Sequence, residues 1–191
     1  MSAKPSSLGR ALREFFADHL PRVRGMSPHT VCSYRDAVML LLRFLAERHD
    51  RDVVKLDFKD LAPDDVIAFL HHLEAERHNA AATRNSRLAA IHAFVRFAAT
   101  NHPEQLELCQ RILAVPFKRA RPRLVEYLEA GEISAILASP DRTIPDGRRD
   151  HALLLTLFNT GARVQEILDV RPSDLQLVRP FQVRLRGKGR K

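Results

Sequence analysis

The stretch NTGARVQEIL, residues 159–168, breaks one apolar helical run and begins another. The run over residues 151–158 ends at Thr160-Gly161, because glycine readily adopts the positive φ that ends a helix. Arg163 is therefore expected in a turn between two helices. Its planar guanidinium suits two oxygens of one phosphate, and Glu166 follows one helical turn later, where it can orient that arginine. An arginine that caps carbonyl groups at a helix junction would give the same local pattern.

The residues that follow this stretch help to identify its role. Residues 168–175, LDVRPSDL, have the pattern of a helix end followed by a turn, and residues 181–186, FQVRLR, alternate like a strand that leads into Gly187 and Lys188. The order helix, glycine, arginine, helix, strand and glycine-flanked lysine resembles the first third of the catalytic domain of tyrosine recombinases, the phage integrase family.

This resemblance implies roles for three residues. Arg163 matches the first catalytic arginine, Glu166 the acidic residue that supports it, and Lys188 the hairpin lysine that protonates the leaving 5′ hydroxyl. Phosphoryl transfer spreads negative charge over oxygens, so loss of one fixed cationic donor typically costs roughly 3 to 4 kcal/mol. A lysine acts as an acid when its pKa is lowered, which the nearby Arg184, Arg186 and Arg190 would do.

The nucleophile of this family is a tyrosine near the C-terminus, which follows a histidine-x-x-arginine element and a further histidine or tryptophan. All of these lie well beyond the glycine-lysine-glycine hairpin, and this chain ends at Lys191. Neither Tyr34 nor Tyr127 matches the position of the nucleophile. Because covalent catalysis requires that hydroxyl, we expect a truncated chain that does not cleave DNA unaided.

The first 116 residues have a helical pattern throughout, and the predicted fold class is mainly α. A short amphipathic helix runs from Leu8 to Leu20 and is expected to end at Pro21. The others are predicted to begin at Ser27-Pro28, near Pro63, at Ala80 and at Pro103, with a buried face on each. Tyr34 is interpreted as part of the core.

Four or five helices before a catalytic domain resemble the SAM-like core-binding domain of the same recombinases. The motif MSPHTVCSYRD, residues 26–36, is close to the opening of that domain, which grips one side of the duplex. Free N–H groups at helix N-termini also favour phosphate binding. The candidate DNA contacts in this domain, each of which could equally be a solvated surface residue, are Arg22, Arg24, His29, Thr30, Arg84 and Arg87.

Residues 116–123, PFKRARPR, mark a boundary, since two prolines prevent a regular helix and the cations disfavour packing onto either domain. We predict a core-binding domain over 1–116, a basic linker over 117–123, and the incomplete start of an α+β catalytic domain over 124–191. A helix pair follows the linker, with a polar loop over 139–149. The linker cations proposed to track the DNA backbone are Lys118, Arg119, Arg121 and Arg123.

The net charge of +8 and the pI near 10.2 favour a polyanionic partner, although an arginine-biased composition would also produce them. Residues 1–116 hold 16 basic and 14 acidic side chains, whereas residues 117–191 hold 15 and 9, so the excess lies where the resemblance places DNA. Cys32 and Cys109 do not suggest a disulfide framework, and no metal or other cofactor is expected. With no signal peptide or membrane span in the sequence, we predict a cytoplasmic protein.

Three functions remain open at the level of sequence. The leading hypothesis is the DNA-binding part of a site-specific tyrosine recombinase, which forms a 3′-phosphotyrosine intermediate when complete and acts with other protomers on a synapsed double-stranded DNA site. The alternatives are a non-catalytic DNA-binding accessory protein and a basic helical interaction module. We also expect residues 124–191 to be less stable than residues 8–115, because a strand without its partners is marginal.

Overall fold

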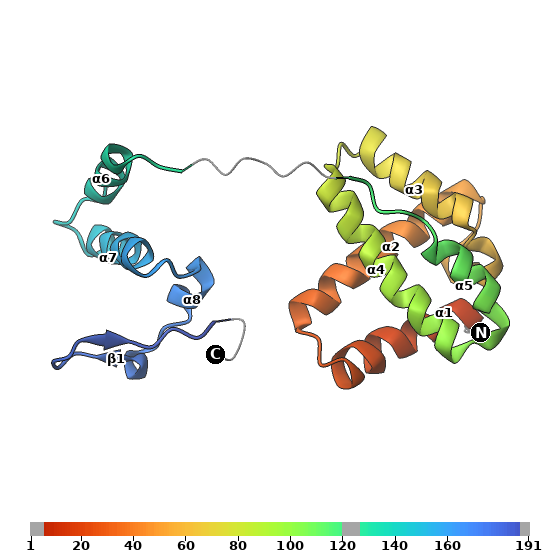
Figure 1. The fold of residues 1–191 in the computed structure, drawn as a ribbon, viewed down its shortest axis with the longest axis horizontal. Helices are drawn as coiled ribbons and strands as arrows, with labels where there is room; N and C mark the ends of the chain where they lie inside the picture. Colours follow the sequence, from red (N-terminus) through yellow and green to blue (C-terminus); the bar gives the residue numbers. More distant parts are fainter. Residues whose placement is uncertain (1–5, 120–126, 188–191) are drawn as a thin grey trace. The chain divides into compact units, whose positions relative to one another are not determined.

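A computed structural model describes residues 6–119 and 127–187 (Figure 1). The chain forms two compact units, here called unit 1 (residues 1–122) and unit 2 (residues 123–191). Both consist mainly of helices, and the described residues hold one small sheet of two strands. The predicted mainly α class is confirmed.

Unit 1 contains five α-helices and a π-helix. Its elements are α1 (Ser7–Glu14), the π-helix η1 (Phe15–Val23), α2 (Pro28–Arg48), α3 (Pro63–Ala75), α4 (Ala81–Asn101) and α5 (Leu106–Leu113), with 3-10 turns at Val53–Lys55, Phe58–Asp60 and Pro103–Gln105.

The starts of α2 and α3 follow directly from the sequence. The Ser27 hydroxyl accepts the main-chain N–H of Thr30 at 3.3 Å, and Pro28 occupies the first helical position, where no N–H is needed. Pro63 plays the same part in α3, and two aspartates in its first turn complement the helix dipole. Both predicted starts are confirmed.

Pro21 does not end the first helix, which corrects the sequence prediction. The backbone continues past it as the π-helix η1, and the N–H of Arg24 donates to the carbonyl of His19 at 2.8 Å, five residues back. In these wider turns the missing N–H of proline and its bulky ring are accommodated without breaking the helix. Leu20, directly before Pro21, lies in the core and is 1% exposed.

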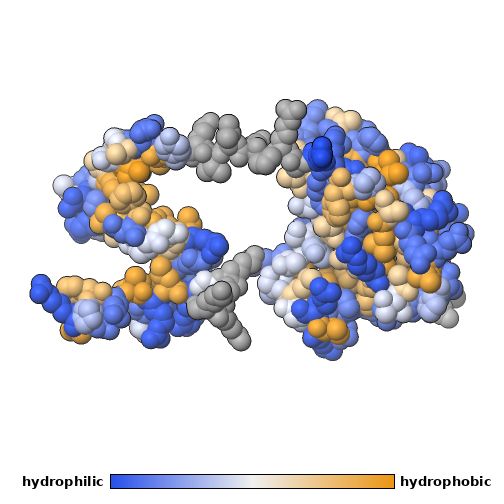
Figure 2. All heavy atoms as spheres, viewed as in Figure 1, coloured by the Kyte–Doolittle hydropathy of each residue, from blue (hydrophilic) through white to orange (hydrophobic). Residues whose placement is uncertain are grey.

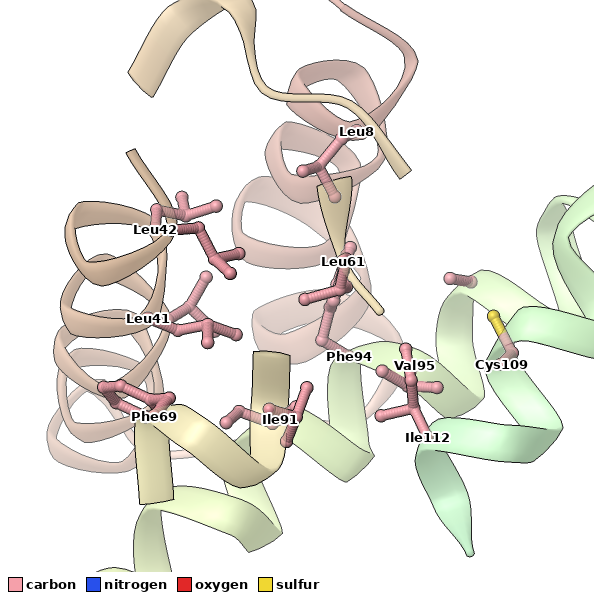
Figure 3. Packing of buried hydrophobic residues seen from close by; sticks show 14 of the residues in the cluster. Leu8, Leu41, Leu42, Leu61, Phe69, Ile91, Phe94, Val95, Cys109 and Ile112 are labelled. Atoms are coloured by element: carbon pink, nitrogen blue, oxygen red, sulfur yellow. The ribbon is translucent and has the colours of Figure 1, made fainter. Parts of the chain in front are cut away.

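The core of unit 1 forms around α4, which contacts α2, α3 and α5 (Figure 3). Leu88, Ile91, Val95 and Ala98 are buried on α4 and form the buried face expected for this helix. Tyr34 is partly buried against the same cluster. Each fully buried leucine, isoleucine or phenylalanine contributes about 1.5 to 3 kcal/mol, so this cluster is the main source of the unit's stability.

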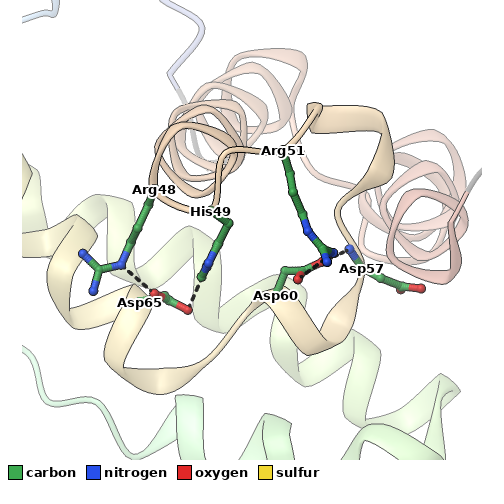
Figure 4. A network of polar contacts seen from close by, with 6 residues as sticks. All are labelled: Arg48, His49, Arg51, Asp57, Asp60 and Asp65. Atoms are coloured by element: carbon green, nitrogen blue, oxygen red, sulfur yellow. Dashed lines mark hydrogen bonds and ion pairs between the residues drawn. The ribbon is translucent and has the colours of Figure 1, made fainter.

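A network of carboxylates fixes the connection between α2 and α3 (Figure 4). Asp65, only 7% exposed, accepts a hydrogen bond from Arg48 Nε at 2.8 Å and lies 3.2 Å from His49 Nε2. Asp60 pairs with Arg51 at 3.1 Å and accepts the main-chain N–H of Asp57 at 2.9 Å.

Asp57 joins this connection to the first helix. Its carboxylate accepts hydrogen bonds from the Ser7 hydroxyl, from the Leu8 N–H at 3.1 Å and from the Phe58 N–H at 2.8 Å. Burial raises the pKa of Asp57, but these donors outweigh it and hold the pKa below its usual value. The start of α1 is thus fixed by a residue about 50 positions away.

Unit 2 contains three helices and a short hairpin. Its elements are α6 (Ala130–Ala138), α7 (Pro145–Thr160), α8 (Val164–Leu168), a 3-10 turn (Pro172–Asp174), β1 (Leu175–Gln176) and β2 (Gln182–Val183). The strands are antiparallel, with Leu175 opposite Val183 and Gln176 opposite Gln182.

Two predicted boundaries in unit 2 are wrong. The polar loop ends at Ile144 rather than Arg149, because Pro145 occupies the first turn of α7. Gly147 allows this path, since a Cβ there would lie 1.8 Å from the carbonyl oxygen of Asp141. The strand predicted over residues 181–186 pairs only at Gln182–Val183, because its partner β1 is two residues long.

Unit 2 buries few apolar side chains among its described residues. Ile167, at 8% exposed, is the one buried hydrophobic residue of 127–187, whereas Tyr127, Phe158 and Phe181 are 81%, 56% and 70% exposed. Apolar side chains are accordingly prominent on its surface (Figure 2). Within the described residues, no helix combines the length and apolar composition needed to cross a membrane.

Candidate phosphate and nucleic-acid sites

Arg163 lies at the junction of α7 and α8, as the sequence predicts. Gly161 ends α7 with φ +62°, and its N–H donates to the carbonyl of Leu157 at 2.9 Å. Arg163 is then the last residue before α8 and has an extended backbone, with φ −74° and ψ 148°. The glycine therefore allows the sharp turn that places Arg163 at a helix N-terminus.

Glu166 holds Arg163 by two different groups. Glu166 Oε1 accepts Arg163 Nη1 at 2.7 Å, and Oε2 accepts the main-chain N–H of Arg163 at 3.0 Å. That N–H, followed by the guanidinium, lowers the pKa of the Glu166 carboxyl. The Arg163 side chain is still 74% exposed, so its orientation is fixed while much of the guanidinium stays accessible to an anion.

Asp174 anchors the chain that returns from the hairpin, a role that sequence reasoning missed. Its buried carboxylate accepts the Arg171 N–H at 3.1 Å and Arg186 Nη2 at 3.0 Å, and its carbonyl accepts the Arg184 N–H at 2.9 Å. The Arg171 N–H, more than the guanidinium of Arg186, lowers the pKa of Asp174. The only signal in the sequence is the aspartate three residues after Arg171, a spacing typical of a capped turn.

This anchor brings the end of the hairpin to Glu166. A Cβ on Gly187 would lie 3.4 Å from Glu166 Oε1, so the residue before Lys188 is beside the Arg163–Glu166 pair. Lys188 itself and Arg190 lie outside the described residues. Arg186, expected to lower the pKa of Lys188, has its charge partly balanced by Asp174.

In unit 1, the N-terminal halves of α2 and α4 form a groove of about 500 Å³. Its lining consists of His29, Cys32, Ser33 and Asp36 from α2 and Ala82, Thr83, Ser86 and Arg87 from α4. Among the described residues no side chain caps α4, so the N–H groups of its first turn are available to an anion, whereas Ser27 occupies the N–H of Thr30 in α2. Of the predicted contacts, His29 and Arg87 therefore share one groove, and Thr30 is not among its lining residues.

The remaining predicted contacts are in other surroundings. Arg22 pairs with Asp18 at 3.2 Å on the surface. Arg24 is exposed and lines a second cleft, of about 370 Å³, together with Tyr34, Arg96 and Phe117. Arg84 and Lys118 bond to groups of unit 1, Arg119 is exposed, and Arg121 and Arg123 fall outside the described residues.

The two cysteines differ in environment. Cys32 is exposed in the groove, while Cys109 is buried in the core, where desolvation raises the pKa of its thiol. In residues 6–119 and 127–187 no three His, Cys, Asp or Glu side chains are grouped as metal ligands.

Comparisons with known proteins match both units. Residues 13–102 match the family described as phage integrase, N-terminal SAM-like domain. Two Sinorhizobium fredii proteins named putative integrase/recombinase, y4rC and y4rD, are each 42% identical to this chain, over 98% and 96% of its length. A tyrosine recombinase XerC of Roseiflexus castenholzii is 33% identical over 92% of the chain. The chain spans 57%, 66% and 53% of these three relatives.

Proposed function

The chain belongs to the phage integrase family of tyrosine recombinases, and from this premise we propose that it is the DNA-binding portion of a site-specific recombinase, together with part of the catalytic site. In this proposal residues 1–116 are the core-binding domain, residues 117–123 are the basic linker, and residues 124–191 begin the catalytic domain. The partners are double-stranded DNA and further recombinase protomers on a synapsed site.

One observation carries the catalytic part of the proposal. Arg163, Glu166 and Gly187 converge, although the last is more than 20 residues from the others along the chain. A phosphoryl-transfer site needs fixed cationic donors around the phosphate and an acid near the leaving oxygen. Arg163 is an oriented, accessible cationic donor, and Gly187 beside it directly precedes Lys188, the candidate acid.

The residues then have distinct roles. Arg163 donates to the non-bridging oxygens of the scissile phosphate, and Glu166 keeps its guanidinium oriented without neutralising its exposed face. Lys188 gives its proton to the leaving 5′ oxygen. The attacking hydroxyl comes from a tyrosine other than Tyr34, which packs against the core of unit 1, and other than Tyr127.

The groove between α2 and α4 supports phosphate binding by unit 1. Two helix N-termini meet there, each with partial positive charge, and His29 and Arg87 add donors. Asp36 also lines this groove, but Arg35 lies 3.4 Å from its carboxylate and partly balances it. Contacts of this kind bind the DNA backbone and carry no sequence information.

Fluorescence anisotropy with a labelled duplex tests this proposal through its salt dependence. Each phosphate contact contributes about 0.9 to the slope of log K against log salt concentration. Arg87→Gln should flatten the slope by about that amount. Arg111→Gln, an exposed arginine on α5, is the matched control and should leave the slope unchanged. Absence of salt-dependent binding by the wild type would contradict the proposal and favour a basic interaction module.

A further inference from the structure

The start of the predicted boundary stretch 116–123 lies against helices α3 and α4. We call Pro116, Phe117 and Lys118 the strap. The Phe117 ring meets His92 of α4 edge-on, with ring centres 5.4 Å apart. The segment therefore does not begin as a free tether, which is what its prolines and cations suggest.

Asn85 of α4 binds the main chain of the strap in both directions. Asn85 Oδ1 accepts the N–H of Lys118 at 3.0 Å, and Asn85 Nδ2 donates to the carbonyl of Lys118 at 2.7 Å. These two bonds fix the backbone at one residue, much as a neighbouring strand would. Only a side chain with both a donor and an acceptor can form the pair.

Two charged side chains complete the contact. Arg84 Nη1 of α4 donates to the carbonyl of Pro116 at 3.2 Å, and Lys118 Nζ lies 2.7 Å from Glu74 Oε1 of α3. The Glu74 side chain is 22% exposed and that of Lys118 is 55% exposed, so water partly screens this pair. Arg84 and Lys118, two of the candidate phosphate contacts, are thus bonded to the protein itself.

We propose that Asn85, Arg84 and Glu74 are positioning residues that keep the strap on α3 and α4 in the DNA complex, so that Arg84 and Lys118 set where the linker leaves these helices and do not contact phosphates. This inference rests on the proposed DNA-binding function. If the strap were released, the free tether would begin three residues earlier and gain about 10 Å of reach. The strap therefore limits how far the linker extends from unit 1.

Hydrogen exchange of the free chain tests the contact without DNA. The Lys118 amide should exchange roughly tenfold faster in Asn85→Ala, which removes its acceptor. Asn101→Ala is the matched control, because Asn101 also lies on α4 but bonds only to Phe97 of its own helix. Equal exchange at Lys118 in wild type and Asn85→Ala would overturn the inference.

Duplex binding tests the role of the strap in the complex. Lys118→Gln should leave the salt slope unchanged, whereas Arg87→Gln flattens it by about 0.9. The Lys118 amide should also stay protected when the wild type is saturated with duplex. If the wild type binds the duplex and Lys118→Gln flattens the salt slope as Arg87→Gln does, the positioning role fails but the proposed function stands. If the wild type binds no duplex, the proposed function fails and the positioning role fails with it.

Discussion

Truncation of one leucine in each unit should separate the stabilities of the two units. Leu88 is fully buried on α4, at the centre of the core of unit 1. Leu88→Ala should cost about 2 to 5 kcal/mol, since it removes buried methyl groups and leaves a cavity. Leu155 on α7 is 40% exposed and has less apolar contact to lose, so Leu155→Ala should cost less than about 1 kcal/mol.

Native-state hydrogen exchange is the suitable assay, because it reports each unit separately where a single unfolding curve would merge them. Leu88→Ala should lower protection in α2 and α4 and leave α7 unchanged. In the wild type, residues 127–187 should exchange faster than residues 8–115, because their core is so small. Equal protection of the two units, or an equal effect of the two substitutions, would refute this reasoning.

Three further predictions concern single residues. Asp57→Asn should cost about 1.5 to 3 kcal/mol at neutral pH. The pKa of Asp57 is lowered in the folded protein, so its carboxylate stabilises the fold above the unfolded pKa, and this stabilisation is lost as pH falls through the folded pKa. In urea titrations below about pH 4, the free energy of unfolding should therefore fall less in Asp57→Asn than in the wild type. Gly161→Ala should destabilise the α7–α8 junction by about 1 to 2 kcal/mol. The cause is the positive φ alone, since a Cβ at Gly161 meets no atom within 4 Å. Unchanged amide hydrogen exchange over residues 161–168 would contradict this. In the complete recombinase, Arg163→Lys should slow strand cleavage by about 10² to 10³-fold and change duplex affinity less than threefold. If the cleavage rate and the duplex affinity fell by the same factor, Arg163 would serve binding only.

The sequence predicts most of the helical architecture because its signals are local. Ser27-Pro28 and Pro63 mark helix starts through capping chemistry, and apolar spacing on α4 identifies its buried face. The pairing of Arg163 with Glu166 is equally predictable, since a residue just before a helix and the glutamate three positions later lie together at the helix N-terminus.

The failures come from contacts between distant residues and from unusual backbone. A proline is read as a helix end, but the π-helix at Pro21 removes the conflict with its ring. Neither the bond from Arg186 to Asp174 nor the bonds from Asn85 to Lys118 can be read from spacing, because these partners lie 12 and 33 residues apart. A basic linker therefore has the composition of a free tether although its first residues are bound.

Chemical-shift mapping of the isotope-labelled chain during titration with a duplex tests the central claim most directly. We predict that the largest shifts occur at the first turns of α2 and α4, around His29 and Thr83, and at Arg163, and that they weaken as salt is raised. The amides of α5 should change little. Shifts confined to α5, or none at these three positions, would contradict the account of a recombinase that holds DNA phosphates through two helix N-termini and an oriented arginine.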